Sequence, residues 1–330
     1  MILHIHPPLP IHEAKTIGAS IEGVEEKIRD FLTCPRKHLL KDWAKWNILN
    51  SAMDLIGDTE MAIEAYLNSK DGGDSGLQYL LIYGILQILF VQQDAAKLIS
   101  DALRLPYEHC DELLKIREIR NDTVGHPANR NGGTRSSFLV RCSMTKQGYT
   151  LLTTHSNGEP DSQEVNLIEL INNQRGVIFT VLTHVIDRLN NEDMEHKKKF
   201  KDTKLMDFFP ASNSYHLGKI FEICPEASDQ ARIIAGISTK IIRENLTKFR
   251  LALVERGEFS DTLEYEIEET AYPIAELDCF FNSRESKLND RDASIFAFFI
   301  RHKLGELEEM AKAIDAEYCV DSSMQDADKQ

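Results

Sequence analysis

The chain has 330 residues, a formal net charge of −15 and 42% hydrophobic residues. This length allows a sizeable core and is typical of two domains, and the composition is that of a soluble protein. The negative charge excludes a broadly basic surface, so any contact with a polyanion must be local. The six cysteines form no Cys-x-x-Cys pair, which indicates reduced cytoplasmic thiols rather than a zinc site or a disulfide scaffold.

Helical periodicity dominates the first third of the chain. Apolar residues recur at three- and four-residue spacing over 13–32 and again over 36–68, which predicts two amphipathic helices. Residues 77–103 are apolar on most of the helix circumference, as expected of the central member of a bundle. Because Gln78 and Gln87 interrupt this apolar run, we expect a buried core helix and no membrane span.

A fourth helix is expected to begin at Pro106, and its buried stripe is predicted to comprise Leu113, Leu114, Ile116 and Ile119. Two short segments rich in β-branched and apolar residues then predict a β-hairpin at about 136–154. A lone hairpin is only marginally stable, so it is expected to pack on the bundle or on a partner chain. A long helix over 163–190 completes an N-terminal helical domain, residues 1–195.

The second half is predicted to be a mostly helical accessory or regulatory domain. The basic stretch 196–204 is interpreted as the linker that precedes it, with a nucleic-acid patch as the alternative. Helical periodicity resumes within 205–320, at about 214–224, 228–256 and 288–317, and residues 321–330 are expected to be disordered. Residues 261–278 contain seven acidic residues and no basic one, which argues against RNA contact there and favours a protein regulator as partner.

The most informative segment is the end of the fourth helix, where Arg120-Asn121-Asp122 is followed by Gly125-His126-Pro127. Glycine is expected to take the left-handed conformation that ends a helix, and proline blocks its continuation. His126 would then fold back beside Arg120. The alternative is a helix C-terminus with an incidental histidine, which the helix dipole favours in any case.

Together these side chains are suited to cleavage of RNA by its own 2′-hydroxyl. Imidazole accepts and donates protons near neutral pH, and guanidinium binds phosphoryl oxygens through several donors. We therefore expect His126 to act as acid and base, Arg120 to clamp the phosphate, and Asn121 and Asp122 to orient them. The basic residues expected to bind RNA lie around the motif and the hairpin: Lys115, Arg117, Arg130, Arg135 and Arg141.

Arg120 and His126, with Asn121-Asp122 between them, resemble the Arg-(four to six residues)-His motif of the HEPN superfamily, and the helical surroundings at about 45–195 fit. The resemblance implies an all-α fold: a HEPN-like helical bundle with an inserted β-hairpin, followed by a second, mostly helical domain. It also implies a metal-independent endoribonuclease without cofactor, of the kind found in antiviral defence and toxin–antitoxin systems. HEPN domains form homodimers in which the motifs of both chains meet in one composite cleft.

Two features limit what the resemblance carries over. One subgroup has a tyrosine two residues after the histidine, where an antitoxin attaches AMP. Here that position is Ala128, so this regulation is not expected. A function from a different class also remains open, namely a catalytically silent HEPN-like module that binds a protein through its acidic C-terminal half.

Overall fold

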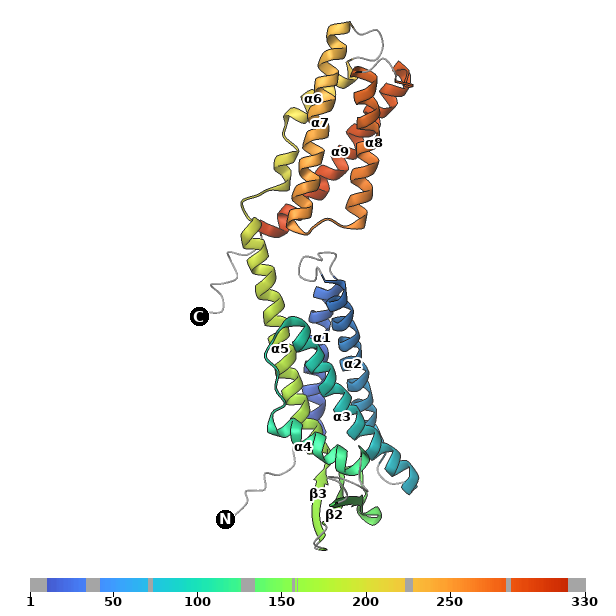
Figure 1. Ribbon diagram of the computed structural model, residues 1–330, viewed down its shortest axis with the longest axis vertical. Coiled ribbons are helices and arrows are strands. Elements are labelled where there is room, and N and C mark those ends of the chain that lie inside the picture. Colours follow the sequence, from blue (N-terminus) through green and yellow to red (C-terminus); the bar gives the residue numbers. More distant parts are fainter. Residues whose placement is uncertain are drawn as a thin grey trace. The chain divides into compact units, whose positions relative to one another are not determined.

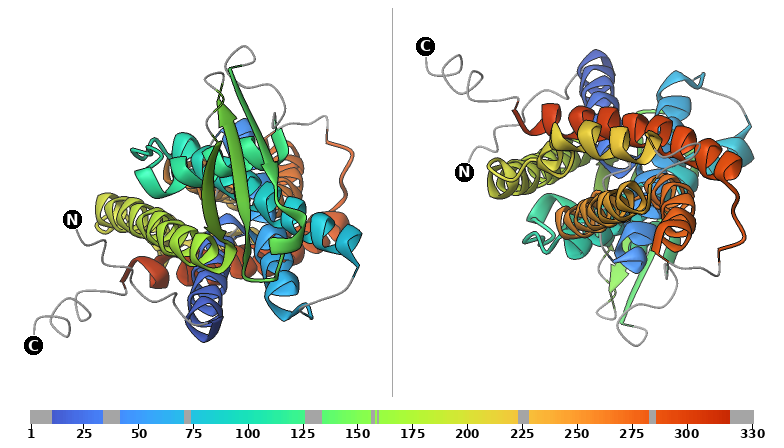
Figure 2. Two further views of the ribbon diagram at one scale, coloured as in Figure 1. Left: turned by 90° about the horizontal axis from the view of Figure 1, so that it is seen from below. Right: turned by 90° about the horizontal axis from the view of Figure 1, so that it is seen from above.

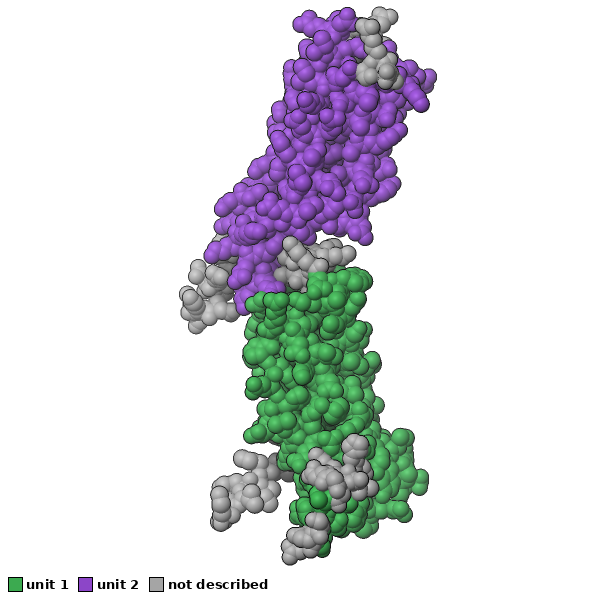
Figure 3. Space-filling model, in the orientation of Figure 1, with its two compact units in different colours: residues 1–34, 42–190 green, residues 35–41, 191–330 purple. Residues whose placement is uncertain are grey.

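The computed structural model describes residues 11–33, 42–70, 74–125, 134–155, 158, 160–222, 228–282 and 286–319. His126, Arg130 and the predicted tail at 321–330 therefore lie outside the described residues. The chain divides into two compact units, coloured separately in Figure 3. Unit 1 comprises residues 1–34 and 42–190, and unit 2 comprises residues 35–41 and 191–330.

Unit 1 is a helical bundle with a small sheet at one end, beside α4 (Figure 1; Figure 2, left). Its elements are α1 (Ile11–Thr33), α2 (Trp43–Asn68), α3 (Ser75–Leu103), α4 (Asp111–Arg120), a π-helical turn (Asn121–Gly125), β1 (Arg135–Leu139), β2 (Gly148–His155), β3 (Pro160–Asn166) and the first part of α5 (Leu167–Phe200). The mostly helical class expected from the sequence is confirmed. The HEPN-like character of the bundle stays a prediction.

The sheet is antiparallel and has the order β1-β2-β3. The predicted hairpin corresponds to β1 and β2, but the prediction of only two strands was wrong. The third strand replaces the start of the helix that was expected from residue 163. Nearly all side chains of β3 are exposed, so the strand lacks the apolar alternation by which strands are recognised. Its pairing with β2 was therefore not visible in the sequence.

A chain of buried polar side chains runs through the core of unit 1. Arg175 of α5 is fully buried and donates to Glu60 of α2 over 2.9 Å, and Gln92 of α3 donates to the other oxygen of the same carboxylate over 2.6 Å. Gln174 donates to the Gln92 carbonyl over 2.7 Å, and Gln93 donates to Gln174 over 2.8 Å. These bonds join α2, α3 and α5 inside an otherwise apolar interior.

By length and composition, α3 passes the test for a membrane-spanning helix, with a mean hydropathy of 1.4. Core helices of soluble proteins pass the same test. The side chains of Gln92 and Gln93 point into the bundle and are hydrogen-bonded there. This inward pairing fits a core position for the inner face of α3. Only 28% of its apolar stretch is buried, however, so the expectation of a buried core helix was too broad, and the absence of a membrane partner stays a proposal.

Unit 2 packs four helices around one apolar core (Figure 1). They are α6 (Ser212–Phe221), α7 (Asp229–Arg256), α8 (Asp261–Asn282) and α9 (Asp290–Cys319), preceded by the end of α5 and a short helical turn (Leu205–Phe208). A buried ion pair between Arg256 and Asp315, 2.8 Å apart, joins α7 to α9. Asp315 also accepts hydrogen bonds from the backbone N–H groups of Leu205 and Met206.

Two expectations for the second half need correction. The linker predicted at 196–204 is helical as far as Phe200, because Phe200 is buried and Lys197 pairs with Asp193 one turn earlier. The acidic stretch was not predicted to be a helix, yet it forms most of α8, whose interior contains Pro273. Its carboxylates are also partly compensated, since Glu264, Glu266 and Asp278 form ion pairs with basic residues of α7 and α9.

The buried ion pair of unit 1 generates a stability prediction. Arg175→Ala would leave Glu60 buried without its cation and should lower the free energy of unfolding by about 3–5 kcal/mol, measured by urea denaturation. Burial raises the pKa of Glu60, although Arg175 lowers it. The loss should therefore be largest at neutral pH and should shrink as the pH falls and Glu60 takes up a proton.

The double variant Arg175→Met/Glu60→Gln is the matched control, because it removes both charges. It should recover much of the stability that Arg175→Ala loses. If the single and double variants were equally unstable, the ion pair would not be the source of the loss.

Candidate functional site

The motif lies where α4 passes into the π-helical turn Asn121–Gly125. The α-helix begins at Asp111 rather than at the predicted Pro106, since proline and the residues after it precede the first helical hydrogen bonds. Leu114 is half exposed, so it does not belong to the buried stripe, whereas Leu113, Ile116 and Ile119 do. Gly125 continues the turn, and its φ is not positive. The left-handed conformation expected at the end of this helix was therefore wrong.

Gly125 nevertheless has a steric role. A Cβ atom at this position would lie 2.8 Å from the Arg120 Nη1 and 3.2 Å from the Asn121 Oδ1. The turn therefore passes directly against the guanidinium group, and a side chain at position 125 would push the end of the Arg120 side chain out of its present position. Close backbone approach, rather than a left-handed conformation, explains the glycine.

Arg120 is half-buried and is held by amide oxygens. Its Nε and Nη2 both donate to the Oε1 of Gln87 on α3, over 3.1 and 2.7 Å. Its Nη1 donates to the Oδ1 of Asn121 over 2.9 Å, so the expected orienting role of Asn121 has a geometric basis. The guanidinium carbon also lies 4.6 Å from the centre of the Phe90 ring, in cation–π contact.

These partners leave the charge of Arg120 uncompensated, because no described carboxylate forms an ion pair with it. Arg117 differs, since it pairs with Asp94 at 2.8 Å and lies 3.9 Å from the centre of the Phe90 ring. The same guanidinium contacts the Nε2 of His109 at 3.3 Å. Burial, and then Arg117, lowers the pKa of His109, so this imidazole is neutral at pH 7 and its Nε2 accepts from Arg117.

Asp122 has a different role from the one expected. Its side chain is buried and forms an ion pair of 2.5 Å with Arg135 of β1. The neighbouring Thr123 hydroxyl lies 2.6 Å from the Tyr149 hydroxyl of β2. The two residues after Asn121 therefore attach the motif to the sheet. Arg135, predicted to bind RNA, is engaged by Asp122 and also by Glu118 at 3.3 Å.

The remaining predicted site residues are less constrained. Lys115 of α4 and Arg141, in the short turn between β1 and β2, are both exposed. His126 and Arg130 lie outside the described residues. Sequence reasoning missed Gln87 and Phe90, which hold Arg120, because they are separated from it by about thirty positions and carry no motif. The interruption of an apolar helix by Gln87 was the available signal.

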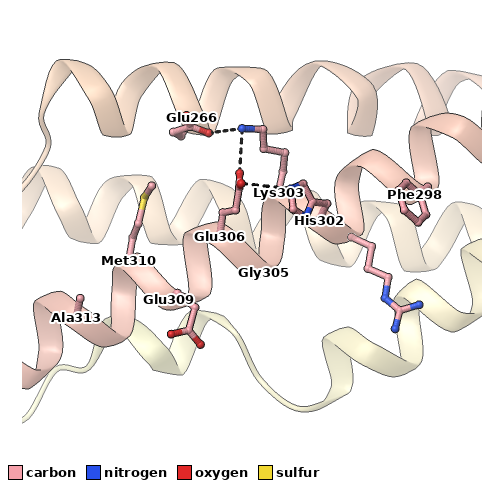
Figure 4. A pocket seen from close by; sticks show the side chains of 10 residues that line it. Glu266, Phe298, His302, Lys303, Gly305, Glu306, Glu309, Met310 and Ala313 are labelled. Atoms are coloured by element: carbon pink, nitrogen blue, oxygen red, sulfur yellow. Dashed lines mark hydrogen bonds and ion pairs between the residues drawn. The ribbon is translucent and has the colours of Figure 1, made fainter.

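Unit 2 contains a separate groove of about 880 Å³ along α9 (Figure 4). Lys303 lies between Glu266 of α8 and Glu306, at 2.6 and 3.0 Å. Hydrogen bonds from these carboxylates raise the pKa of Lys303 above its ordinary value. The lysine is therefore a paired, protonated structural group. His302 also lines this groove and lies 3.3 Å from Glu306, and the exposed Phe298 beside them is typical of a contact surface.

Comparison with models of protein families, with curated proteins and with solved structures found no match for this chain. The candidate site therefore stands on its own geometry.

The two partners of Arg135 generate a paired prediction. Asp122→Ala should lower the free energy of unfolding by about 2 kcal/mol, because it leaves the partly buried guanidinium without its buried partner. Glu118→Ala removes the exposed partner of the same arginine and should cost less than about 1 kcal/mol. Urea denaturation measures both. Equal losses would contradict the anchoring role of Asp122.

Proposed function

We propose that this protein is a metal-independent endoribonuclease of HEPN type. The observation that supports the proposal best is the state of Arg120. A half-exposed guanidinium is fixed by Gln87 and Asn121, both neutral, so its charge stays available to a phosphate. His126 follows six residues later, in the spacing that resembles the HEPN motif.

In the proposed reaction the 2′-oxygen of RNA attacks the adjacent phosphorus. The 2′-O–P bond forms and the P–O5′ bond breaks, which leaves a 2′,3′-cyclic phosphate and a 5′-hydroxyl. His126 takes the proton of the 2′-hydroxyl, and an imidazolium returns a proton to the leaving O5′. Arg120 stabilises the negative charge that develops on the phosphoryl oxygens.

Metal independence is proposed from the residues around Arg120. Divalent cations in phosphoryl-transfer sites are usually held by carboxylates. The two carboxylates nearest in sequence, Glu118 and Asp122, both form ion pairs with Arg135, and Asp122 is buried. Among the described residues no group of three or more His, Cys, Asp or Glu side chains could hold a metal ion. The chemistry is therefore assigned to imidazole and guanidinium, without a cofactor.

A homodimer with a composite cleft is part of the proposal. One motif offers a single uncompensated guanidinium and a single histidine, whereas two copies supply two of each, so that one imidazole can act as base and the other as acid. Sedimentation of the full-length chain measures whether the dimer forms. The proposed location is the cytoplasm, from the cysteine pattern, and the proposed role is antiviral defence or a toxin–antitoxin response, from the resemblance.

A second candidate function rests on unit 2. The groove on α9 carries exposed Phe298 beside Gly305, and a Cβ atom at Gly305 would meet no other atom within 4 Å. An open apolar surface of this kind suits contact with a protein. In this alternative the chain is a silent interaction module, or unit 2 binds a regulator of the nuclease.

His126→Ala should lower the rate of RNA cleavage by about two to four orders of magnitude, the range typical of removing a general acid or base. The measurement is cleavage of total RNA by purified protein in EDTA. A wild-type activity that EDTA abolishes and Mg²⁺ restores would contradict the mechanism. His155→Ala is a suitable control, since it removes an exposed histidine at the end of β2.

Arg120→Lys should fail to restore the activity that Arg120→Ala loses. An ammonium group is a point charge and cannot donate from a planar fork to Gln87, Asn121 and two phosphoryl oxygens. Rates should be compared on folded protein, confirmed by circular dichroism. Equal rates for lysine and arginine would show that only the net charge at position 120 matters.

A further inference from the structure

The face of α3 that holds Arg120 continues toward the start of the helix as a partly exposed stripe. Leu80, Tyr83, Gly84 and Gln87 lie at three- and four-residue spacing and so share one stripe of the helix. Leu80 is 68% exposed and Tyr83 is 37% exposed. Gln87 belongs to this stripe and to the arginine site at once, because its carbonyl oxygen accepts both bonds from Arg120.

Gly84 is unexplained by the packing of the bundle. Glycine inside a helix destabilises it by about 0.5–1 kcal/mol relative to alanine. A Cβ atom at Gly84 would meet no other atom within 4 Å, so no neighbour requires its absence. Its φ is not positive either. The missing side chain leaves a shallow recess on the surface of α3 between Leu80 and Gln87, open among the described residues.

The hydrogen bonds of Gln87 give this recess a chemical character. Since guanidinium only donates, the Gln87 carbonyl oxygen must face Arg120, which fixes the side-chain amide. The amide nitrogen is therefore oriented as well, and no described residue accepts a hydrogen bond from it. Side chains of a helix lean toward its N-terminus, so the Gln87 side chain lies over the turn that contains Tyr83 and Gly84. The result is a fixed amide donor beside an open recess.

Tyr83 supplies an aromatic surface at the same place. Its ring packs edge-to-face against Tyr79, with the ring centres 5.7 Å apart, and it is still 37% exposed. A ring held on one side and open on the other is suited to stacking on a flat ligand. The aromatic ring of Tyr83, the recess at Gly84 and the amide of Gln87 thus lie along one face of α3. Arg120 of α4 lies next to Gln87 and supplies a cation for a phosphate.

We propose that Tyr83, Gly84 and Gln87 form a subsite for a nucleobase of single-stranded RNA, whose neighbouring phosphate is bound by Arg120. This inference rests on the proposed nuclease function and names its substrate class. The base stacks on Tyr83 over Gly84 and accepts a hydrogen bond from the Gln87 amide. Bases of a duplex are stacked on each other and cannot enter, so single strands are preferred.

Gly84→Ala tests the subsite, because stability and binding should change in opposite directions. Alanine favours the helix, so the melting temperature should rise by about 2–4 °C. Its methyl group fills the recess, so binding should weaken by about five- to a hundredfold. The full-length protein is titrated against a fluorescein-labelled, unstructured 2′-fluoro oligonucleotide, which lacks the attacking hydroxyl and is not cleaved.

Gly176→Ala is the matched control. Gly176 also lies inside a helix of unit 1, and a Cβ atom there would meet nothing within 4 Å. It should raise the melting temperature similarly and leave binding unchanged. Tyr83→Phe should keep most of the affinity and Tyr83→Leu should lose it, because the ring is the stacking surface.

Salt dependence separates the base contact from the phosphate contact. Gly84→Ala should leave the slope of log Kd against log salt unchanged, whereas Arg120→Ala should reduce the slope. If wild-type protein binds RNA and Gly84→Ala binds equally well, the subsite is wrong and the nuclease proposal survives. If wild-type protein neither binds nor cleaves RNA, both are wrong. If Gly84→Ala instead changes the association state in sedimentation, the face is a contact between copies and the subsite is overturned.

Discussion

The arrangement of unit 1 depends on one buried chain of hydrogen bonds. It begins at Arg175 and Glu60, passes through Gln92, Gln174 and Gln93, and ends at Arg117, which donates to the Gln93 Oε1 over 3.4 Å. Gln93 donates to Gln174, Gln174 donates to Gln92, and Gln92 donates to the Glu60 carboxylate, so all three amides are oriented in the same direction. An apolar core of the same volume would tolerate small sliding movements of one helix along another, but buried polar groups are costly when unpaired. The chain therefore fixes the register of α3 against α4 and α5, and with it the meeting of Gln87 and Arg120.

The same register explains how an acidic protein keeps the charge of one guanidinium uncompensated by a described carboxylate. Of the basic residues near the motif, Arg117 and Arg135 are neutralised by Asp94 and Asp122. Arg120 is positioned by amides, which fix a guanidinium as firmly as carboxylates do but leave its charge in place. With −15 overall, attraction of RNA over long distances is weak, so affinity must come from contacts made at the site. A base contact close to Arg120 would supply affinity of this local kind.

The sequence predicted what periodicity can encode, and it failed where contacts are distant. Amphipathic spacing predicted the helices of the bundle, and β-branched residues predicted β1 and β2. The exposed strand β3 lacks such a pattern and was missed. Helix α8 was also missed, although Leu263, Ile267, Ile274, Leu277 and Phe281 recur at helical spacing on either side of its internal proline. Arg120 and Asn121 were selected correctly as neighbours, but Gln87 comes from another helix and no local rule could pair it with Arg120. Asp122 was expected to orient the motif, but it forms an ion pair with Arg135 of β1, which follows the π-helical turn in the sequence.

Gly125 lies against the Arg120 guanidinium, and Gly84 lies one turn before Gln87, which binds that guanidinium. The surroundings of the two glycines differ. A side chain at Gly125 would displace the Arg120 guanidinium from its present position. Gly84 is not required by any contact of the fold, although it weakens the helix on which Gln87 is mounted. Gly176 of α5 is open in the same way, so the case for a subsite at Gly84 depends on its position beside Tyr83 and Gln87. Gly125 lets the π-helical turn pass close to the Arg120 guanidinium. Gly84 leaves the surface of α3 open one turn before Gln87, which binds the same guanidinium. In the proposed subsite the substrate lies on this open side, with its base against α3 and its phosphate at Arg120.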